Sequence, residues 1–145
     1  MSAKPNAVVQ RFNELPASPT MRLLGFRLLD FHPAKRVANC SVEIDSQLTN
    51  VMGSIHGGGI AAALDTAASV AAMCASDLQA KFPTLEIKCI FLETPPAGPL
   101  KVEGRVLKLG SSVAFLEASL YSATGALLAT STQTSKVRAS KRETE

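Results

Sequence analysis

The pattern of apolar residues predicts one long helix and several shorter strands. Residues 60–75 are apolar except for Asp65, Thr66 and Ser69, and alanine dominates among them. Alanine has the highest helix propensity, and a helix that is apolar on nearly all sides is normally buried. This run therefore predicts a central buried helix, and residues 57–59, which directly precede it, are all glycine.

Four strand-like segments follow, at residues 84–92, 100–109, 112–121 and 126–137. Alternation with a period of two predicts strands that bury one face. In the first segment one face is predicted to carry Leu85, Ile87, Cys89 and Phe91. In the second, the apolar face is predicted to carry Leu100, Val102 and Val106. Short turn-forming links join the last three segments, so these should form an antiparallel meander.

The first part of the chain predicts a short amphipathic helix at residues 7–15, which two prolines would end. Residues 21–31 and 36–44 should pair as strands across a turn that contains Pro33. Residues 45–55 and 77–83 are predicted to be connections without strands. Beyond Val137 the charged residues have no apolar anchor, so we expect this tail to fray.

These elements predict an α+β fold in one domain. Strands that are grouped before and after one buried helix indicate an antiparallel sheet layered on that helix, rather than a doubly wound parallel sheet. A single curled sheet should then bury the helix on most of its faces. The 145 residues suffice for one domain with a substantial core, and no internal repeat or domain boundary is visible.

Composition and charge exclude several classes of protein. The net charge is only +3, and much of the basic charge lies in residues 136–141, which does not favour nucleic-acid binding. No signal-peptide pattern begins the chain, and the apolar run is shorter than a membrane span needs. The three cysteines show no metal-ligand spacing, and their odd number argues against a disulfide framework. We expect a soluble, cytoplasmic protein that binds no membrane.

Asp65 is the residue on which a functional interpretation depends. A carboxylate in an apolar helix is costly unless it is paired or functional. The glycines let a ligand approach backbone N–H groups at the helix start, where negative charge is favoured. Gly57 and Asp65 are eight residues apart, about 12 Å along a helix. Because one helix cannot bring them together, an active site would need two antiparallel helices related by a two-fold axis.

A resemblance to a known family supports this interpretation. The stretch HGGGIAAALDTA, together with Asn50 and with the later stretches RVLKLGSSVAFLEA and TGALLATST, resembles the hotdog-fold acyl-CoA thioesterases. Within that family the chain is similar to the branch that contains the phenylacetate-pathway and human thioesterase-superfamily enzymes. The resemblance covers roughly residues 20–137. It implies a hotdog fold, in which an antiparallel sheet wraps around the long helix.

The resemblance also implies roles for individual residues. The Gly57 N–H would polarise the thioester carbonyl, and Asn50 would orient the substrate or water. Asp65 of the neighbouring subunit would act as general base or nucleophile, and the Thr84 hydroxyl would help to place the water. Substrate-binding positions would include Gly58, Ser69 and the turn formed by Gly110, Ser111 and Ser112. In that turn, many members have a basic residue directly after the glycine, whereas this chain has serine.

In such an enzyme the acyl-CoA is the substrate, and neither a cofactor nor a metal is implied. The resemblance further implies a homodimer with shared active sites, assembled as a homotetramer, with no nucleic-acid partner. The acyl group remains open.

Structural alternatives exist for each residue. His56 could act directly or brace the loop, Asn50 could stabilise a turn, and Thr84 could be an ordinary strand residue. Asp65 could be a purely structural carboxylate, and the glycines could serve packing alone.

Three other functions compete with thioester hydrolysis as interpretations of the sequence: a non-catalytic acyl-CoA sensor, a hotdog hydratase or dehydratase, and a structural protein without a substrate. A dehydratase of this kind usually has a histidine that follows an aspartate in an Asp-x4-His motif. Neither His32 nor His56 follows an aspartate at that spacing.

Overall fold

The computed structural model describes residues 6–141. Its elements, in chain order, are α1 (Ala7–Glu14), α2 (Pro19–Leu24), β1 (Arg27–His32), β2 (Val37–Glu43), the 3-10 helix η1 (Ser46–Leu48), α3 (Gly57–Ala75), β3 (Ala80–Lys81), β4 (Thr84–Phe91), β5 (Pro99–Leu109), β6 (Val113–Tyr121), β7 (Leu127–Lys136) and β8 (Arg138–Ala139).

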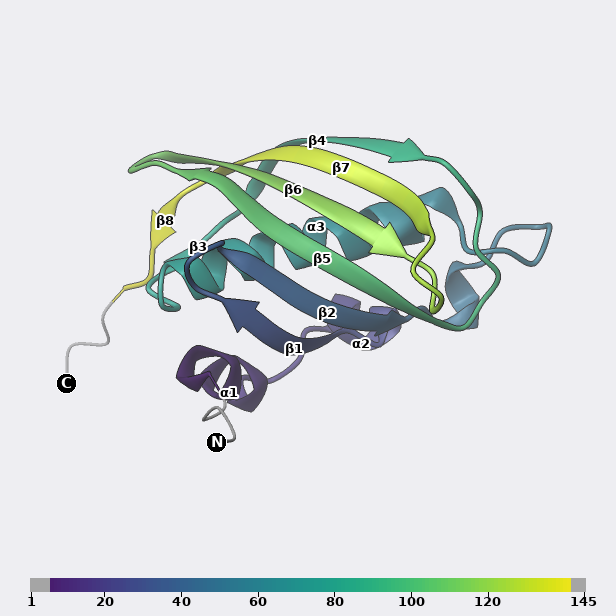
Figure 1. The fold of residues 1–145 in the computed structure, drawn as a ribbon, viewed down its shortest axis with the longest axis horizontal. Helices are drawn as coiled ribbons and strands as arrows, with labels where there is room; N and C mark the ends of the chain where they lie inside the picture. The colour runs from purple at the N-terminus through teal and green to yellow at the C-terminus, as the bar shows by residue number, and fades with distance from the viewer. Residues whose placement is uncertain (1–5, 142–145) are drawn as a thin grey trace.

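One antiparallel sheet of six strands, in the order β1-β2-β5-β6-β7-β4, packs against α3 (Figure 1). The α+β fold and the meander of β5, β6 and β7 are therefore confirmed. Helix α1 is also present as predicted, and it packs beside β1.

Helix α3 packs directly on the backbone of β5 at Gly104. The predicted inward residues Leu100, Val102 and Val106 are indeed buried. Gly104 occupies the inward position between the two valines, and a Cβ added to it would lie only 2.0 Å from the backbone oxygen of Ala67. The sheet and the helix can approach this closely only because no side chain separates them.

The domain buries most, but not all, of α3. Ten of its nineteen residues are buried, whereas Gly57, Ala61, Asp65 and Ser69 remain partly exposed along one stripe. The expectation that the helix would be buried on most faces is therefore confirmed, and this stripe is the part of α3 that a single chain leaves partly exposed. By length and apolar composition α3 could span a membrane, but 56% of its apolar window is buried inside the domain, as in a core helix.

The strand predicted at residues 21–31 begins later than expected, because residues 19–24 form α2. Ser18 caps this helix by accepting a hydrogen bond from the Met21 N–H, and Pro19 occupies its first turn. Gly25 ends it in the left-handed conformation, with φ +53°. Proline is favoured at the first helical position, so the proline that was expected to break a helix starts one instead.

Two further expectations about connections are wrong. Residues 77–83 contain β3, and the tail beyond Val137 contains β8, which pairs with β3. Backbone hydrogen bonds therefore hold the tail as far as Ser140, whose N–H donates to the Gln79 carbonyl, although the tail has no apolar anchor. The rest of the predicted tail, residues 142–145, lies outside the described residues.

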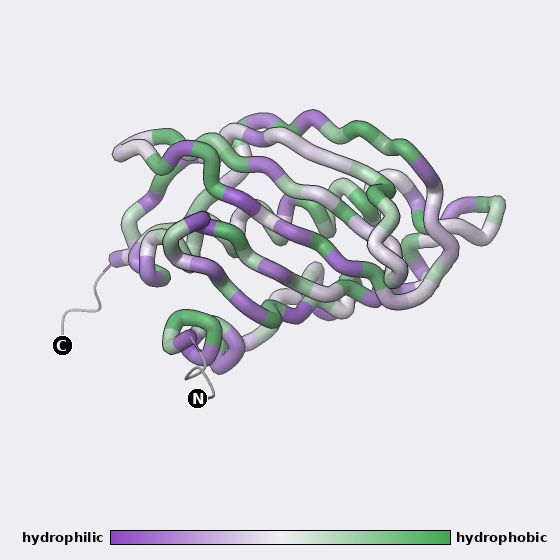
Figure 2. The backbone as a smooth tube through the Cα atoms, viewed as in Figure 1, coloured by the Kyte–Doolittle hydropathy of each residue, from purple (hydrophilic) through white to green (hydrophobic). Residues whose placement is uncertain are grey.

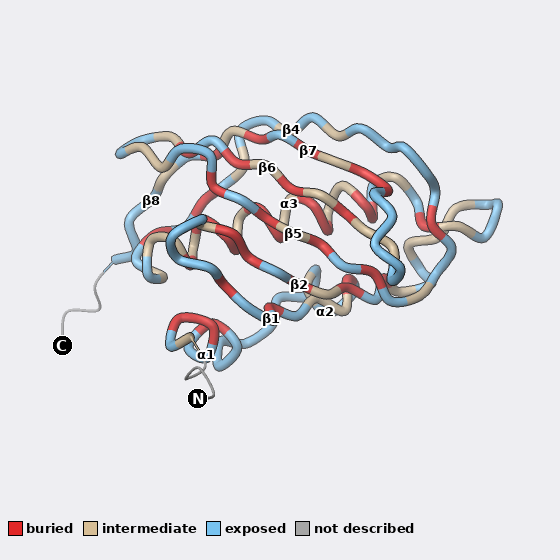
Figure 3. Tube along the Cα trace, viewed as in Figure 1, coloured by how far each residue is buried: buried red, intermediate tan, exposed pale blue. Residues whose placement is uncertain are grey.

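Strand β4 forms one edge of the sheet and is mostly exposed (Figure 3). Hydrophilic and hydrophobic residues alternate along it (Figure 2). An irregularity in its pairing with β7, between Thr84 and Glu86, interrupts the strict alternation. Leu85 lies at this irregularity and is 61% exposed, so its predicted place on the buried face is wrong.

Candidate active site

In the part of the chain that the structure describes, the start of α3 presents one backbone N–H group without a hydrogen-bond partner. His56 is the N-cap residue, and its Nδ1 accepts a hydrogen bond from the Gly58 N–H at 2.8 Å. The His56 carbonyl accepts from the N–H groups of Gly59 and Ile60. Within residues 6–141 the Gly57 N–H donates to no other group. A helix start favours negative charge, so this N–H can polarise a carbonyl that gains negative charge.

The cap explains the role of His56 in the structure. One ring nitrogen braces the loop, which was the structural alternative for this residue. By occupying the Gly58 N–H, His56 leaves the Gly57 N–H as the donor that a ligand can use. Gly57 and Gly58 were both candidate site residues, and the structure distinguishes them: the Gly58 N–H is bonded to His56, whereas the Gly57 N–H is available to a ligand.

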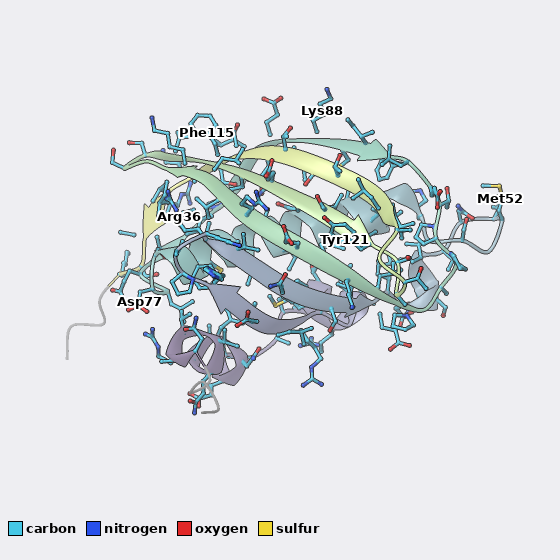
Figure 4. The ribbon with its side chains drawn as sticks, in the orientation of Figure 1. Arg36, Met52, Asp77, Lys88, Phe115 and Tyr121 are labelled. Atoms are coloured by element: carbon cyan, nitrogen blue, oxygen red, sulfur yellow. The ribbon has the colours of Figure 1, made fainter. Side chains whose placement is uncertain are left out.

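Asn50 stabilises the loop before the helix. Its Oδ1 accepts from the N–H groups of Met52 and Ser54 and from the Ser54 hydroxyl, at 2.9–3.2 Å. These three hydrogen bonds correspond to the structural alternative for Asn50, the stabilisation of a turn, and they fix the tip of the loop. Met52 at this tip is 80% exposed and points away from the body of the domain (Figure 4).

Asp65 is held by two side chains of the sheet. The Thr84 hydroxyl donates to Asp65 Oδ1 at 2.6 Å, and the Gln133 amide donates to the same oxygen at 3.1 Å. No hydrogen bond to Oδ2 occurs within residues 6–141. A carboxylate with one oxygen fixed and the other available is suited to accept a proton from water.

Gln133 is a site residue that the sequence analysis missed. Its side chain is 4% exposed, and its Nε2 also lies 3.1 Å from Ser135 Oγ and 3.4 Å from the hydroxyls of Ser69 and Thr84. Its Oε1 is buried without a hydrogen-bond partner in the described part of the chain. The available signal was the position of a long polar residue on the inward face of a predicted strand.

The other candidates lie at separate places. Ser69 follows Asp65 by one helical turn and joins the Gln133 network. The turn at Gly110, Ser111 and Ser112 lies at the end of the sheet opposite the start of α3 (Figure 1). No hydrogen bond joins this turn to Gly57 or Asp65 within residues 6–141. The structure therefore unites Asp65, Thr84 and Ser69, but leaves Gly57, Asn50 and His56 at a second location and the turn at a third.

The cysteines and His32 do not supply alternative reactive groups. Burial raises the pKa of the Cys74 thiol to about 12, and burial also raises the pKa of Cys40. Cys89 has a raised pKa because of burial and, secondarily, the negative charge of Asp65. These thiols stay protonated at neutral pH and are poor nucleophiles. His32 is the last residue of β1, and its Nδ1 accepts a hydrogen bond from the Lys35 N–H in the following turn.

Comparisons with known proteins identify the family. The family described as the thioesterase superfamily matches residues 52–129. A protein from Saccharolobus solfataricus, provisionally named an esterase, is 30% identical over 111 residues, which are 77% of each chain.

Two solved structures have the same fold. A phenylacetic acid degradation-related protein from Ralstonia eutropha, provisionally described as a thioesterase, superimposes with a TM-score of 0.81 at 23% identity, over 90% of this chain and 99% of that chain. A Streptococcus mutans protein bound to acetyl-CoA superimposes with a TM-score of 0.73 at 18% identity, over 89% of this chain and 97% of that chain. The fold is therefore the predicted hotdog fold.

Proposed function

The chain belongs to the thioesterase superfamily, and on this basis we propose that it hydrolyses an acyl-CoA to a free acid and CoA. The observation that carries the proposal is a pair of groups on α3 that are partly exposed and have no hydrogen-bond partner within residues 6–141: the Gly57 N–H and Asp65 Oδ2. The first can stabilise an oxyanion, and the second can take a proton from water. These are the two groups that hydrolysis of a thioester requires.

The reaction needs two copies of the chain. Gly57 and Asp65 lie eight residues apart on α3, about 12 Å along its axis. The partly exposed stripe of Gly57, Ala61, Asp65 and Ser69 has small side chains, which would allow a second α3 to pack closely. In an antiparallel pair, Asp65 of one copy would lie near Gly57 of the other. We propose a homodimer with two shared sites, paired into a tetramer.

The chemical steps follow from these positions. The thioester carbonyl accepts a hydrogen bond from the Gly57 N–H, and a water molecule donates to Asp65 of the second copy. Asp65 takes the proton as the water oxygen bonds to the carbonyl carbon, and the oxyanion forms against Gly57. The carbon–sulfur bond then breaks, and the departing CoA thiolate takes up the proton that Asp65 received, which restores the carboxylate. In the alternative role, Asp65 would attack the carbonyl carbon itself and expel CoA as a thiolate, forming an anhydride that water then hydrolyses to the free acid and the Asp65 carboxylate.

CoA is proposed as the thiol because the Streptococcus mutans protein of the same fold binds acetyl-CoA. In the antiparallel dimer the turn at Gly110, Ser111 and Ser112 comes from the end of the sheet far from its own Gly57. It would therefore meet the substrate of the other copy. The serines can donate hydrogen bonds to phosphate oxygens through their hydroxyl groups.

Release of free thiol from a panel of acyl-CoAs tests the proposed function. The panel contains acetyl, hexanoyl, decanoyl, benzoyl and phenylacetyl-CoA, and a thiol-trapping dye follows the reaction. We expect turnover with at least one member at a rate well above spontaneous hydrolysis. Binding without turnover across the whole panel would instead favour the sensor alternative.

Gln133→Leu tests how Asp65 is positioned. Leucine has a similar size but no amide, so the carboxylate loses one donor while the strand keeps its buried side chain. We expect kcat to fall by about 10-fold to 100-fold with KM nearly unchanged, because the proton acceptor is misplaced but substrate binding is not. Ser135→Ala is the control, since Ser135 contacts Gln133 but not Asp65. An unchanged kcat in Gln133→Leu would exclude this role.

A further inference from the structure

Three residues of β4 face α3. In the pairing of β4 with β7, Ile87 lies opposite Gln133, Cys89 opposite Ser131 and Phe91 opposite Ala129. Directly paired residues of neighbouring strands share one face of the sheet. Gln133 reaches Asp65 of α3, so its partners on β4 also lie on the helix side. We call Ile87, Cys89 and Phe91 the β4 inner strip.

The neighbouring residues of β4 face the other way. Lys88 extends away from α3 on the outer side of the sheet (Figure 4). Ile90 lies two residues after Lys88, on the same outer side of β4, and is 47% exposed. The inner strip contains no charged side chain, so the surface that β4 presents to α3 between Gly57 and Asp65 is apolar.

Phe91 lies beside Gly57, the residue at the start of α3 whose N–H has no hydrogen-bond partner within residues 6–141. A Cβ built onto Gly57 would be 3.5 Å from Cζ of the Phe91 ring and 3.8 Å from both Cε atoms. The ring therefore reaches across from the edge strand to the start of the helix. Phe91 is nevertheless 48% exposed on this edge strand, so a ligand can reach its side chain.

We propose that Phe91 is a specificity-determining residue that limits the bulk of the acyl group. This inference rests on the proposed function, which places the thioester carbonyl on the Gly57 N–H. A carbonyl at that point has two substituents, the acyl group and the sulfur of CoA. The apolar inner strip complements the acyl group, whereas the CoA arm carries amides and phosphates that an uncharged apolar surface does not satisfy. The acyl group therefore contacts the ring of Phe91.

The size of the Phe91 ring limits the bulk of the acyl group that fits beside Gly57. Phe91→Ala removes the ring beside Gly57 without changing the backbone N–H or Asp65, so the room for the acyl group increases. An apolar pocket discriminates by about 10-fold to 200-fold in kcat/KM between substrates that differ by one methylene. Removal of an aromatic ring frees the space of several methylenes. Phe91→Ala should therefore have a higher kcat/KM for bulky acyl groups, whereas small acyl groups lose their contact with the ring.

The experiment measures kcat/KM across straight-chain acyl-CoAs from acetyl to dodecanoyl, and for phenylacetyl-CoA, in wild type and Phe91→Ala. We expect the ratio of kcat/KM between the bulkiest and the smallest substrates to rise at least 10-fold. Ile90→Ala is the matched control, because it removes an apolar side chain of similar exposure from the outer side of the same strand. Its profile should match that of wild type.

An unchanged profile in Phe91→Ala, with wild-type turnover intact, would overturn the proposal while leaving the proposed function in place. If wild type hydrolyses no acyl-CoA, the proposed function fails. The role of Phe91 is then decided by calorimetric binding of non-hydrolysable thioether analogues that carry the same acyl series. If Phe91→Ala binds the bulky analogues more tightly than wild type does, the ring limits the size of the acyl group. If the two proteins show the same affinities across the series, the proposal is refuted.

Discussion

Asp65→Asn is expected to lower kcat by about 100-fold to 10,000-fold, the range that a general base contributes. Asparagine keeps the size of the side chain, and its oxygen can still accept the hydrogen bonds from Thr84 and Gln133. What it loses is the ability to take a proton or to attack a carbonyl. The variant should therefore fold and bind substrate while its turnover nearly vanishes.

Thiol release and size-exclusion chromatography on the same preparations measure turnover and assembly. Asp30→Asn is a matched control, because it makes the same chemical change on the exposed residue Asp30 of β1. If Asp65→Asn keeps most of the wild-type kcat, the assignment of Asp65 is wrong.

The shared site predicts complementation between two inactive chains. Gly57→Val should block the carbonyl position, whereas Asp65→Asn removes the proton acceptor. In a mixed dimer, Gly57 of the Asp65→Asn chain meets the intact Asp65 of the other chain. One of the two sites is then complete. We expect a co-expressed mixed dimer, purified through two different tags, to recover up to half of the wild-type kcat. A mixed dimer that stays inactive would contradict a site built from two copies.

Gly104→Ala is expected to destabilise the fold by at least about 3 kcal/mol, the upper end of the usual cost of overpacking. The added methyl group would lie 2.0 Å from the Ala67 oxygen and 2.4 Å from its carbonyl carbon. These are backbone atoms in the middle of α3, so no side-chain rotation relieves the clash. The helix must move away from the sheet, and the Asp65 contacts with β4 and β7 move with it.

Thermal unfolding measures this effect, and we expect Tm to fall by about 10 °C or more. Gly125→Ala adds the same methyl group where no atom lies within 4 Å. Its backbone has φ +93°, so the control costs only the strain of a left-handed residue, about 1–2 kcal/mol. Equal losses in the two variants would show that close packing at Gly104 is not what holds the helix.

Local patterns predicted the elements that depend on neighbouring residues. The central helix was predicted from its alanines and the strands from their alternation. These features follow from helix propensity and from which side of each element is apolar. The start of α2 was missed because Pro19 was interpreted as a helix breaker. The residues that start and end α2 are nevertheless local signals in the sequence: Ser18 and Pro19 at its start and Gly25 at its end.

The sequence by itself determined the α+β class, the central helix, and the identities of Gly57 and Asp65 as the residues of interest. Only the tertiary structure decided which groups surround them. Gln133 is 68 residues from Asp65, Phe91 is 34 residues from Gly57, and Gly104 is 37 residues from Ala67. Contacts of this kind depend on strand order, register and the pairing irregularity near Thr84. Those features are set by the packing of the whole sheet on α3, so no short stretch of sequence contains them.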